Sequence, residues 1–189
     1  WYDEAKEKEA ATLLIGRGCK LISQHADSMG APTACESAGV PNVSYNGSTL
    51  DACPNTFIVS SRINWVPYMK YMIECVRDNK AIDTDWCKGI NEGAVELTPI
   101  NEKVAAPGTA EAIKAAEEQF KAGTLHVFDT STFTVDGKTL TSYMADVDTD
   151  EKFTPDTEVI SNGYFHESEK RSAPYFDVNI DGITLLNEG

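Results

Sequence analysis

The chain has 189 residues, of which 41% are hydrophobic and 24% charged, and these proportions are ordinary for a soluble globular protein with a core of its own. Its 30 acidic residues against 16 basic ones give a formal net charge of −14, which argues against a nucleic acid or an anionic membrane surface as the partner. No apolar run approaches the roughly 20 residues that span a bilayer.

The first residues, Trp1-Tyr2-Asp3, lead directly into a helical pattern without an initiating methionine, so we expect the chain to begin inside a longer fold. Asp3 is a suitable N-cap for a helix that ends near Gly16 and Gly18. Residues 20–24 then predict a short buried strand. Trp1 stands where a strand before this helix would end, and strand ends bind ligands in α/β domains. It is therefore a binding-site candidate.

Helices and strands are predicted to alternate through the first half of the chain. A short helix has Pro32 in its first turn and Gly39 as its stop, and strands are expected over 42–45 and 56–60. From Trp65 to Val76, apolar residues recur with helical spacing. This alternation predicts an α/β fold, a three-layer doubly wound domain with a mostly parallel sheet.

The second half is expected to turn to strands and hairpins after a strand over 94–97 and a helix over 109–123. Hairpin turns are predicted at Asp136-Gly137 and Asp181-Gly182, and the polar stretch from about 145 to 174 is expected to wrap the surface. We accordingly predict an α/β ligand-binding lobe over residues 1–125. Residues 126–189 would form a strand- and hairpin-rich extension packed on the same lobe.

The five cysteines include no C-x-x-C pair and no histidine at ligand spacing, so the sequence predicts no bound metal and no cofactor. Cys19 and Cys35 fall beside apolar positions, where a cysteine acts as a small buried hydrophobe. One disulfide among the others remains open.

The carboxyl ends of parallel strands meet at one edge of a sheet, and the loops expected at this edge are polar and aromatic. The ligand-binding candidates that they hold are Trp1, Asp27, Asn46, Asn64 and Trp65. An aromatic ring that stacks, together with a carboxylate and amides, suits a polar ligand with a flat face.

Structural roles compete with binding at three of these positions. Asp27 could cap the next helix, Asn64 could cap the helix that follows it, and Trp65 could be that helix's first core residue. A nucleophilic triad of Ser28, His25 and Asp27 is disfavoured, because the three lie within four residues of one loop. His25 is more simply a packing or capping residue at the strand end than a metal ligand.

The blocks Trp1 to Ala11, Gln24 to Ser28, Asn64 to Tyr68 and Trp86 to Ile90 together resemble the basic membrane lipoprotein (Bmp) family. The resemblance implies a type 1 periplasmic-binding-protein fold with two α/β lobes and a purine nucleoside or base bound between them. It implies no catalysis, and as partners a small-molecule solute, an ABC transporter permease and a missing N-terminal lobe of the same protein. It also implies a cell-surface or periplasmic location with a lipid anchor in a missing N-terminal segment.

In nucleoside-binding members of the family, an aromatic residue at the position of Trp1 stacks on the base, and polar residues at positions matching Asp27, Asn46 and Asn64 reach the ribose or the base edge. Asn46 stands where an Asp is common and Asn64 near where a Lys is common, and the Gln-His-x-Asp-Ser block with its Trp is similar to a branch associated with free bases such as adenine. Two other functions remain open. One is a doubly wound enzyme with Asp27 as acid or base, and the other is a ligand-sensing domain of a regulator.

Overall fold

The computed structural model describes residues 2–147, 151–152, 154–167, 169 and 178–186. The chain divides into two compact units, Trp1–Lys121 and Ala122–Gly189, and each is described by itself. Trp1, the first binding-site candidate, lies outside the described residues.

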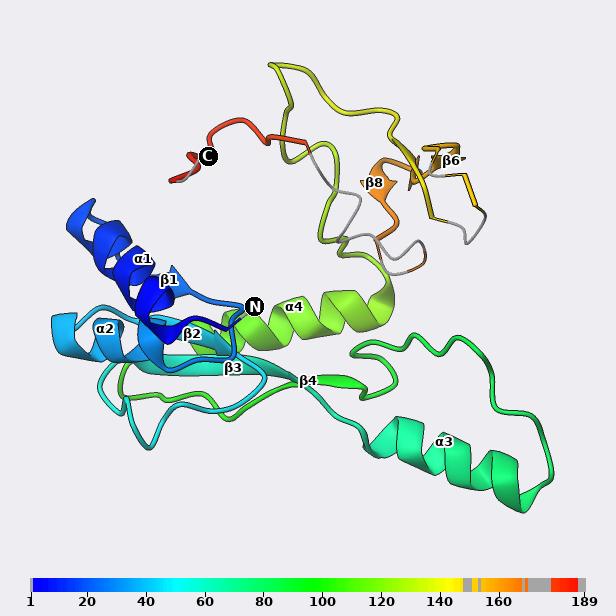
Figure 1. Ribbon diagram of the computed structural model, residues 1–189, viewed down its shortest axis with the longest axis horizontal. Coiled ribbons are helices and arrows are strands. Elements are labelled where there is room, and N and C mark those ends of the chain that lie inside the picture. Colours follow the sequence, from blue (N-terminus) through cyan, green and yellow to red (C-terminus); the bar gives the residue numbers. More distant parts are fainter. Residues whose placement is uncertain (1, 148–150, 153, 168, 170–177, 187–189) are drawn as a thin grey trace. The chain divides into compact units, whose positions relative to one another are not determined.

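Unit 1 is built on a four-stranded sheet in the order β1-β2-β3-β4 (Figure 1). Its strands are β1 (Ile22–Ser23), β2 (Asn42–Tyr45), β3 (Phe57–Ile63) and β4 (Val95–Leu97). Strand β2 pairs in parallel with both β1 and β3, and β4 pairs antiparallel with β3. The predicted α/β fold with a mostly parallel sheet is confirmed.

Two buried asparagines fix the strand register. The Asn42 amide nitrogen donates to the Ile22 carbonyl oxygen at 2.9 Å, and its amide oxygen accepts from the Ser44 hydroxyl at 2.8 Å. Asn101, which follows β4, donates from its side chain to the carbonyl oxygens of Pro54 and Phe57 at 3.0 and 2.9 Å. A buried amide left unpaired is costly, so these bonds disfavour any shift of the strands.

Helices α1 (Glu4–Gly16) and α2 (Gly30–Ala38) lie side by side (Figure 1). Asp3 caps α1 as predicted, because its Oδ1 accepts from the Lys6 backbone N–H at 3.0 Å. Gly39 ends α2 with a φ of 67°, in the left-handed region that glycine favours. The two helices and β1 share one core cluster, formed by Ala11, Ile22, Ala31, Ala34 and Cys35.

The backbones of α1 and α2 come very close at Gly30. A Cβ atom built on Gly30 would lie 2.2 Å from the Glu4 carbonyl oxygen and 2.9 Å from the Lys8 nitrogen. Only glycine permits this approach, which brings α1 against the loop that leads into α2.

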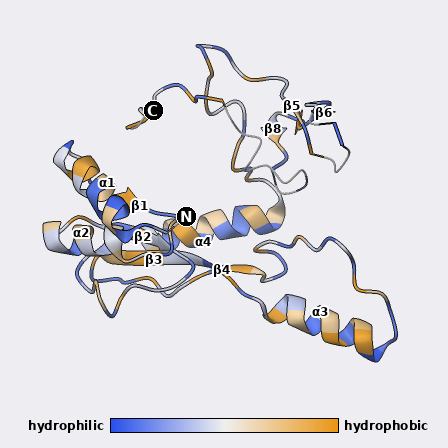
Figure 2. Ribbon diagram, in the orientation of Figure 1, coloured by the Kyte–Doolittle hydropathy of each residue, from blue (hydrophilic) through white to orange (hydrophobic). Residues whose placement is uncertain are grey.

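The helices α3 (Val66–Arg77) and α4 (Thr109–Ala122) occupy the segments in which helical spacing was predicted. Apolar and polar residues alternate along α3 (Figure 2). The interpretation of Trp65 as a core residue is wrong, because its side chain is exposed, as are those of Met69, Ile73 and Val76. Helical periodicity identifies an apolar stripe and does not say what covers it.

Unit 2 contains two short antiparallel pairs. Strand β5 (Met144–Ala145) pairs with β6 (Thr157–Glu158), and β7 (Ile160–Ser161) pairs with β8 (Tyr164–Phe165). Their apolar residues form a small core of Ala145, Val159, Ile160 and Phe165. The polar segment over residues 145–174, which was expected to wrap the surface, thus contributes apolar residues to a small core within unit 2.

The predicted turn at Asp136-Gly137 is confirmed by positive φ angles of 52° and 72° and by a bridge between Val135 and Lys138. Asp181 lies beside this turn, since its carboxylate accepts from the Thr134 hydroxyl at 2.5 Å and from the Gly137 N–H at 2.8 Å. The Thr134 hydrogen bond lowers the pKa of Asp181. Residues 175–177 of the second predicted hairpin lie outside the described residues, and residues 178–186 form a turn without strand pairing.

Candidate functional site

The loops that leave β1 and β2 lie next to each other at the carboxyl edge of the sheet. The Gln24 N–H donates to the Val43 carbonyl oxygen at 3.1 Å, and the Asn46 N–H donates to the Ser61 carbonyl oxygen at 2.7 Å. Backbone hydrogen bonds between adjacent strands therefore hold the polar residues that follow β1 and β2.

The loop from Gln24 to Ser28 is further fixed by side chains. The Gln24 Nε2 donates to the carbonyl oxygens of Ala26 and Ser28, both at 3.2 Å. The Ser28 hydroxyl donates to the Glu7 carboxylate of α1 and accepts from the Gly30 N–H at 3.1 Å. Helix α1 thus holds the loop in one conformation, as a preorganised binding site requires.

His25 and Tyr45 join the two loops by stacking. Their ring centroids are 4.2 Å apart and the rings are inclined by 13°. The expectation that His25 packs at the strand end is confirmed. Because His25 is exposed, the stacked pair presents a flat aromatic surface beside the polar loop.

Asp27 has an exposed carboxylate that makes no hydrogen bond or ion pair with the part of the chain that the structure describes. Its interpretation as a cap of α2 is wrong, because the Ser28 hydroxyl accepts from the first N–H of that helix. The fold therefore uses Ser28 for capping and leaves the Asp27 carboxylate available to an external donor.

Asn46 is exposed and has a φ of 70°, a left-handed conformation that asparagine tolerates better than most residues. The tight turn continues with a hydrogen bond from the Gly47 N–H to the Tyr45 carbonyl oxygen at 2.9 Å. This turn brings Asn46 to the same edge as the His25–Tyr45 pair.

Asn64 and Trp65 lie farther out than the other candidates. Ser61 pairs with Tyr45, the last residue of β2, and Asn64 follows three residues later, about 10 Å farther along an extended chain. The Asn64 amide oxygen accepts from the Val66 N–H, the first of α3, at 3.1 Å, although the N-cap position itself is Trp65. The prediction of Asn64 as the N-cap is therefore wrong by one residue. The structure thus brings Asp27 and Asn46 to one edge and places Asn64 and Trp65 beyond it.

Gln24 is a further site candidate, which the sequence interpretation did not include. Its Oε1 is buried and finds no hydrogen-bond partner within the described ranges. Its position at the end of a predicted buried strand, before a polar loop, was the available signal. The Gln24 Oε1 and the Asp27 carboxylate are thus two groups near this edge that can accept hydrogen bonds from a ligand.

A second polar constellation lies in unit 2, on the β7–β8 hairpin. The Ser161 hydroxyl is 2.7 Å from the His166 Nε2, and the His166 Nδ1 is 3.1 Å from a Glu169 oxygen. Tyr164 stacks on His166 with a centroid distance of 4.1 Å. Because these contacts join residues no more than five apart along one short segment, we assign them to holding that hairpin together.

Across the described parts of the chain, no three His, Cys, Asp or Glu side chains gather closely enough to hold a metal ion. In the same parts, each helix is too short or too polar to cross a membrane.

A family model described as ABC transporter substrate-binding protein, PnrA-like (Bmp), matches residues 1–127. A purine-binding protein of Brucella abortus is 28% identical over 122 residues, which cover 62% of this chain and 35% of the relative. A putative ABC transporter glucose-binding protein of Haloferax volcanii is 28% identical over 134 residues, which cover 70% of this chain and 34% of the relative. The chain thus spans about a third of the length of these curated relatives.

Two solved structures share the fold. A solute-binding protein of an ABC transporter system from Conexibacter woesei matches with a TM-score of 0.52 and 23% identity, over 67% of this chain and 43% of its own. A transcriptional activator of the comK gene from Bacillus halodurans matches with a TM-score of 0.57 and 17% identity, over 64% and 43%. At these identities the matches establish the fold alone, which serves both transport and regulation.

Proposed function

The chain belongs to the Bmp family of PnrA-like ABC transporter substrate-binding proteins, and we propose that it forms one lobe of a solute-binding protein that delivers a purine nucleoside or nucleobase to an ABC importer. The family consists of binding proteins and not of enzymes, and ABC substrate-binding proteins are extracellular or periplasmic. The family assignment therefore favours transport over an enzyme or a regulator.

The observation that carries the proposal is the Asp27 carboxylate, which has no partner among the described residues, beside the stacked rings of His25 and Tyr45. A purine is a flat ring with N–H donors at its edge, and a nucleoside adds ribose hydroxyls. A carboxylate accepts hydrogen bonds from both kinds of donor, and charge-assisted bonds of this type are among the strongest in proteins. The aromatic surface suits a flat ring, which can stack on it.

We propose roles for the other candidates in the same site. Trp1 would stack on the ring of the ligand, as the Bmp resemblance implies. Asn46 would contact a polar edge of the ligand from the β2 loop, and the buried Gln24 Oε1 would accept from a donor that enters the loop. Asn64 and Trp65 would contact only ligand atoms that extend beyond the strand ends.

The proposal for the whole protein goes further. A second lobe would close over the ligand, because good small-molecule sites bury about 70–90% of their ligand and an open sheet edge leaves much of it in water. An ABC permease would receive the solute, and a lipid anchor in an N-terminal segment would hold the protein at the membrane. One relative is named for purine binding and another for glucose binding, so these are the two classes of solute to compare.

The test is calorimetric titration with adenine, adenosine and glucose on the full polypeptide that the gene encodes. Asp27→Asn should weaken purine binding by about 10-fold or more, since losing a charge-assisted bond costs roughly 1.5–3 kcal/mol. Asp51→Asn, on the exposed connection after β2, is the matched control and should change the affinity less than twofold.

Equal affinities of the Asp27→Asn and Asp51→Asn proteins would contradict the role of Asp27. Tight binding of glucose without binding of either purine would contradict the proposed solute class.

A further inference from the structure

The turn after β2 contains a pair of residues that can react with each other. Asn46 is followed by Gly47, and only one other asparagine of the chain, Asn162, is followed by glycine. In such a pair the glycine backbone nitrogen can attack the asparagine side-chain amide, because glycine has no Cβ to hinder a close approach. Asn46 is also one of the residues proposed above to contact the solute, so a reaction there changes the proposed site.

The backbone at Asn46 has the shape of a strained γ-turn. Its φ is 70°, and the Gly47 N–H donates to the carbonyl oxygen of Tyr45, two residues earlier, at 2.9 Å. A three-residue turn with a positive φ at its central residue is rare and strained. The Asn46 N–H donates to the Ser61 carbonyl oxygen at 2.7 Å, so strand β3 holds the turn in place. A reaction that opens this turn therefore relieves strain.

The reacting groups at this turn are accessible. Residues 46–48 are exposed, and the Asn46 side-chain amide makes no hydrogen bond with the part of the chain that the structure describes. The Gly47 N–H has to leave the Tyr45 carbonyl oxygen before its nitrogen can react. A hydrogen bond across so short a turn is far from linear, and bent hydrogen bonds are weak.

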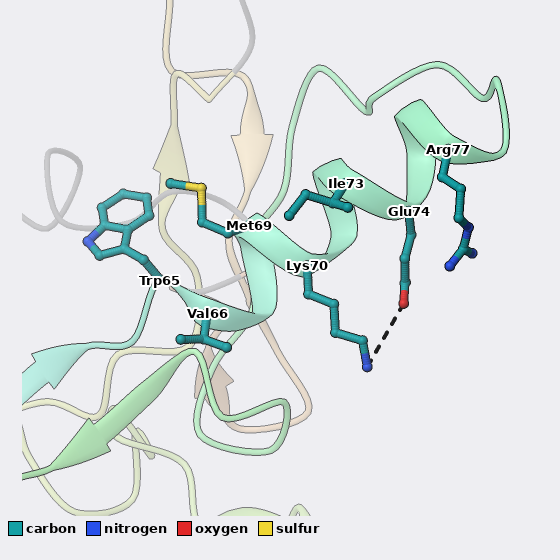
Figure 3. A pocket seen from close by; sticks show the side chains of 7 residues that line it. All are labelled: Trp65, Val66, Met69, Lys70, Ile73, Glu74 and Arg77. Carbon is teal, nitrogen blue, oxygen red and sulfur yellow. Dashed lines mark ion pairs between the residues drawn. The ribbon is translucent and has the colours of Figure 1, made fainter.

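Asn64, the other amide among the site candidates, lacks these features. It is followed by Trp65, whose large ring lines the groove along α3 together with Met69 and Ile73 (Figure 3). The Asn64 amide oxygen also accepts from the Val66 N–H at 3.1 Å, which fixes the side chain. Asn64 is therefore an internal comparison that should not react.

Asn162 precedes a glycine but lies in an unstrained turn. Asn162 and Gly163 have φ angles of 52° and 84°, the combination that Asn-Gly readily adopts in a two-residue hairpin turn. Strands β7 and β8 pair on either side of the turn, and the Gly163 carbonyl oxygen accepts from the N–H and the hydroxyl of Thr130 at 2.8 and 2.9 Å. A reaction at Asn162 would thus distort a well-bonded hairpin without relieving strain.

We infer that Asn46 is a site of spontaneous deamidation, which converts an amide of the proposed solute site into a carboxylate. The Gly47 nitrogen forms a bond to the Asn46 Cγ, the bond between Cγ and Nδ2 breaks, and the Gly47 amide proton leaves with Nδ2 as ammonia. Water then opens the cyclic imide. Attack of water at Cγ gives aspartate, and attack at the backbone carbonyl carbon gives isoaspartate, in which the main chain continues through Cγ.

The modification changes which ligands the strand-end edge favours. An asparagine amide both donates and accepts hydrogen bonds, whereas a carboxylate only accepts them. With Asp27 already at this edge, a carboxylate at position 46 favours a ligand with several donors, such as the ribose hydroxyls of a nucleoside, over a free base. This effect on binding rests on the proposed function, and the reaction at Asn46 does not.

Peptide mapping tests the reaction on the polypeptide that the complete gene encodes. The folded protein is kept in mildly alkaline buffer, because ring closure requires the backbone amide to lose its proton, and a parallel sample is kept in mildly acidic buffer. Chromatography with mass spectrometry should find aspartate and isoaspartate at position 46 in the alkaline sample. They should form several-fold faster than at position 162, and Asn64 should stay intact.

Gly47→Ala is the matched variant. A Cβ at this position meets nothing within 4 Å, and the φ of Gly47 lies outside the left-handed region, so the fold should be kept, as circular dichroism checks. The added Cβ hinders the attack and should slow the conversion of Asn46 several-fold. An intact Asn46 in the alkaline sample, conversion of Asn162 at the same rate, or an unchanged rate in the Gly47→Ala protein would each overturn the inference.

Calorimetric titration of the Asn46→Asp protein tests the effect on binding. Its ratio of adenosine affinity to adenine affinity should exceed that of the fresh wild-type protein by about 10-fold, as expected for one added charge-assisted hydrogen bond. An equal ratio would overturn the effect on binding. If the wild-type protein bound neither purine, the proposed function would fail while the result of the peptide mapping would stand.

Discussion

Replacing Gly30 by alanine should destabilise unit 1 through a backbone clash. The new Cβ would lie 2.2 Å from the Glu4 carbonyl oxygen, whereas ordinary contact begins at 3.4 Å, so α1 and α2 would have to separate by about 1.2 Å. Overpacking typically costs about 1–3 kcal/mol, and an immobile backbone oxygen places this case near the upper end. Restricting the unfolded chain returns about 0.4–1 kcal/mol, which leaves a net loss of about 2 kcal/mol.

Urea unfolding followed by far-UV circular dichroism measures this loss. With a denaturant slope of about 2 kcal/mol per M, the midpoint should fall by about 1 M. Gly16→Ala is the matched control, because Gly16 also lies in a helix but a Cβ there meets nothing within 4 Å, and it should leave the midpoint unchanged or raise it. If Gly30→Ala unfolded at the wild-type midpoint with the same slope, the close approach of α1 and α2 would be refuted.

Two further predictions concern titratable groups near α2. Burial raises the pKa of the Cys35 thiol to about 11, so at pH 8 only about one part in a thousand of this thiol is thiolate. Alkylation of the native protein should therefore modify the exposed Cys87 well before Cys35. Equal alkylation rates of the two cysteines, measured by mass spectrometry of peptides, would contradict the burial of Cys35. The Thr56 hydroxyl, 2.7 Å from the Glu36 carboxylate, lowers the pKa of Glu36. The stability from this bond is present above the ordinary pKa of 4.5 and is lost as the pH falls through the lower folded-state value. Glu36→Gln should therefore flatten the loss of thermal stability below pH 4.5, and an unchanged acid limb in a calorimetric pH series would argue against this bond.

Local chemistry predicted the elements of unit 1 well. The Asp3 side chain caps a helix start and the Gly39 backbone permits a helix stop in almost any context. Strand β2 also matches its predicted bounds. Whether the apolar face of α3 is buried could not be predicted from the sequence, because periodicity marks an apolar stripe and only tertiary contacts decide its burial. The small core of unit 2 was missed because Val159 and Ile160 form a single short apolar pair inside a polar stretch.

The candidate site could be predicted in part. A polar loop after a buried strand pointed to Asp27, and the structure leaves its carboxylate without a partner among the described residues. The stacking of His25 on Tyr45 could not be foreseen, because it depends on the register of β1 against β2, which Asn42 fixes through a bond across 20 residues. The role of Trp1 remains a prediction.

The hydrogen bonds of Asn101 have a consequence for synthesis on the ribosome. Its amide nitrogen satisfies the carbonyl oxygen of Phe57, 44 residues earlier, so β3 leaves the exit tunnel well before this partner does. At about 5–20 residues per second, the delay is roughly 2–9 seconds. During that interval the outer edge of β3 is unpaired, and an exposed strand edge invites association with other nascent chains. Translation pauses within residues 64–100 should therefore lower the soluble yield more than pauses placed after Asn101.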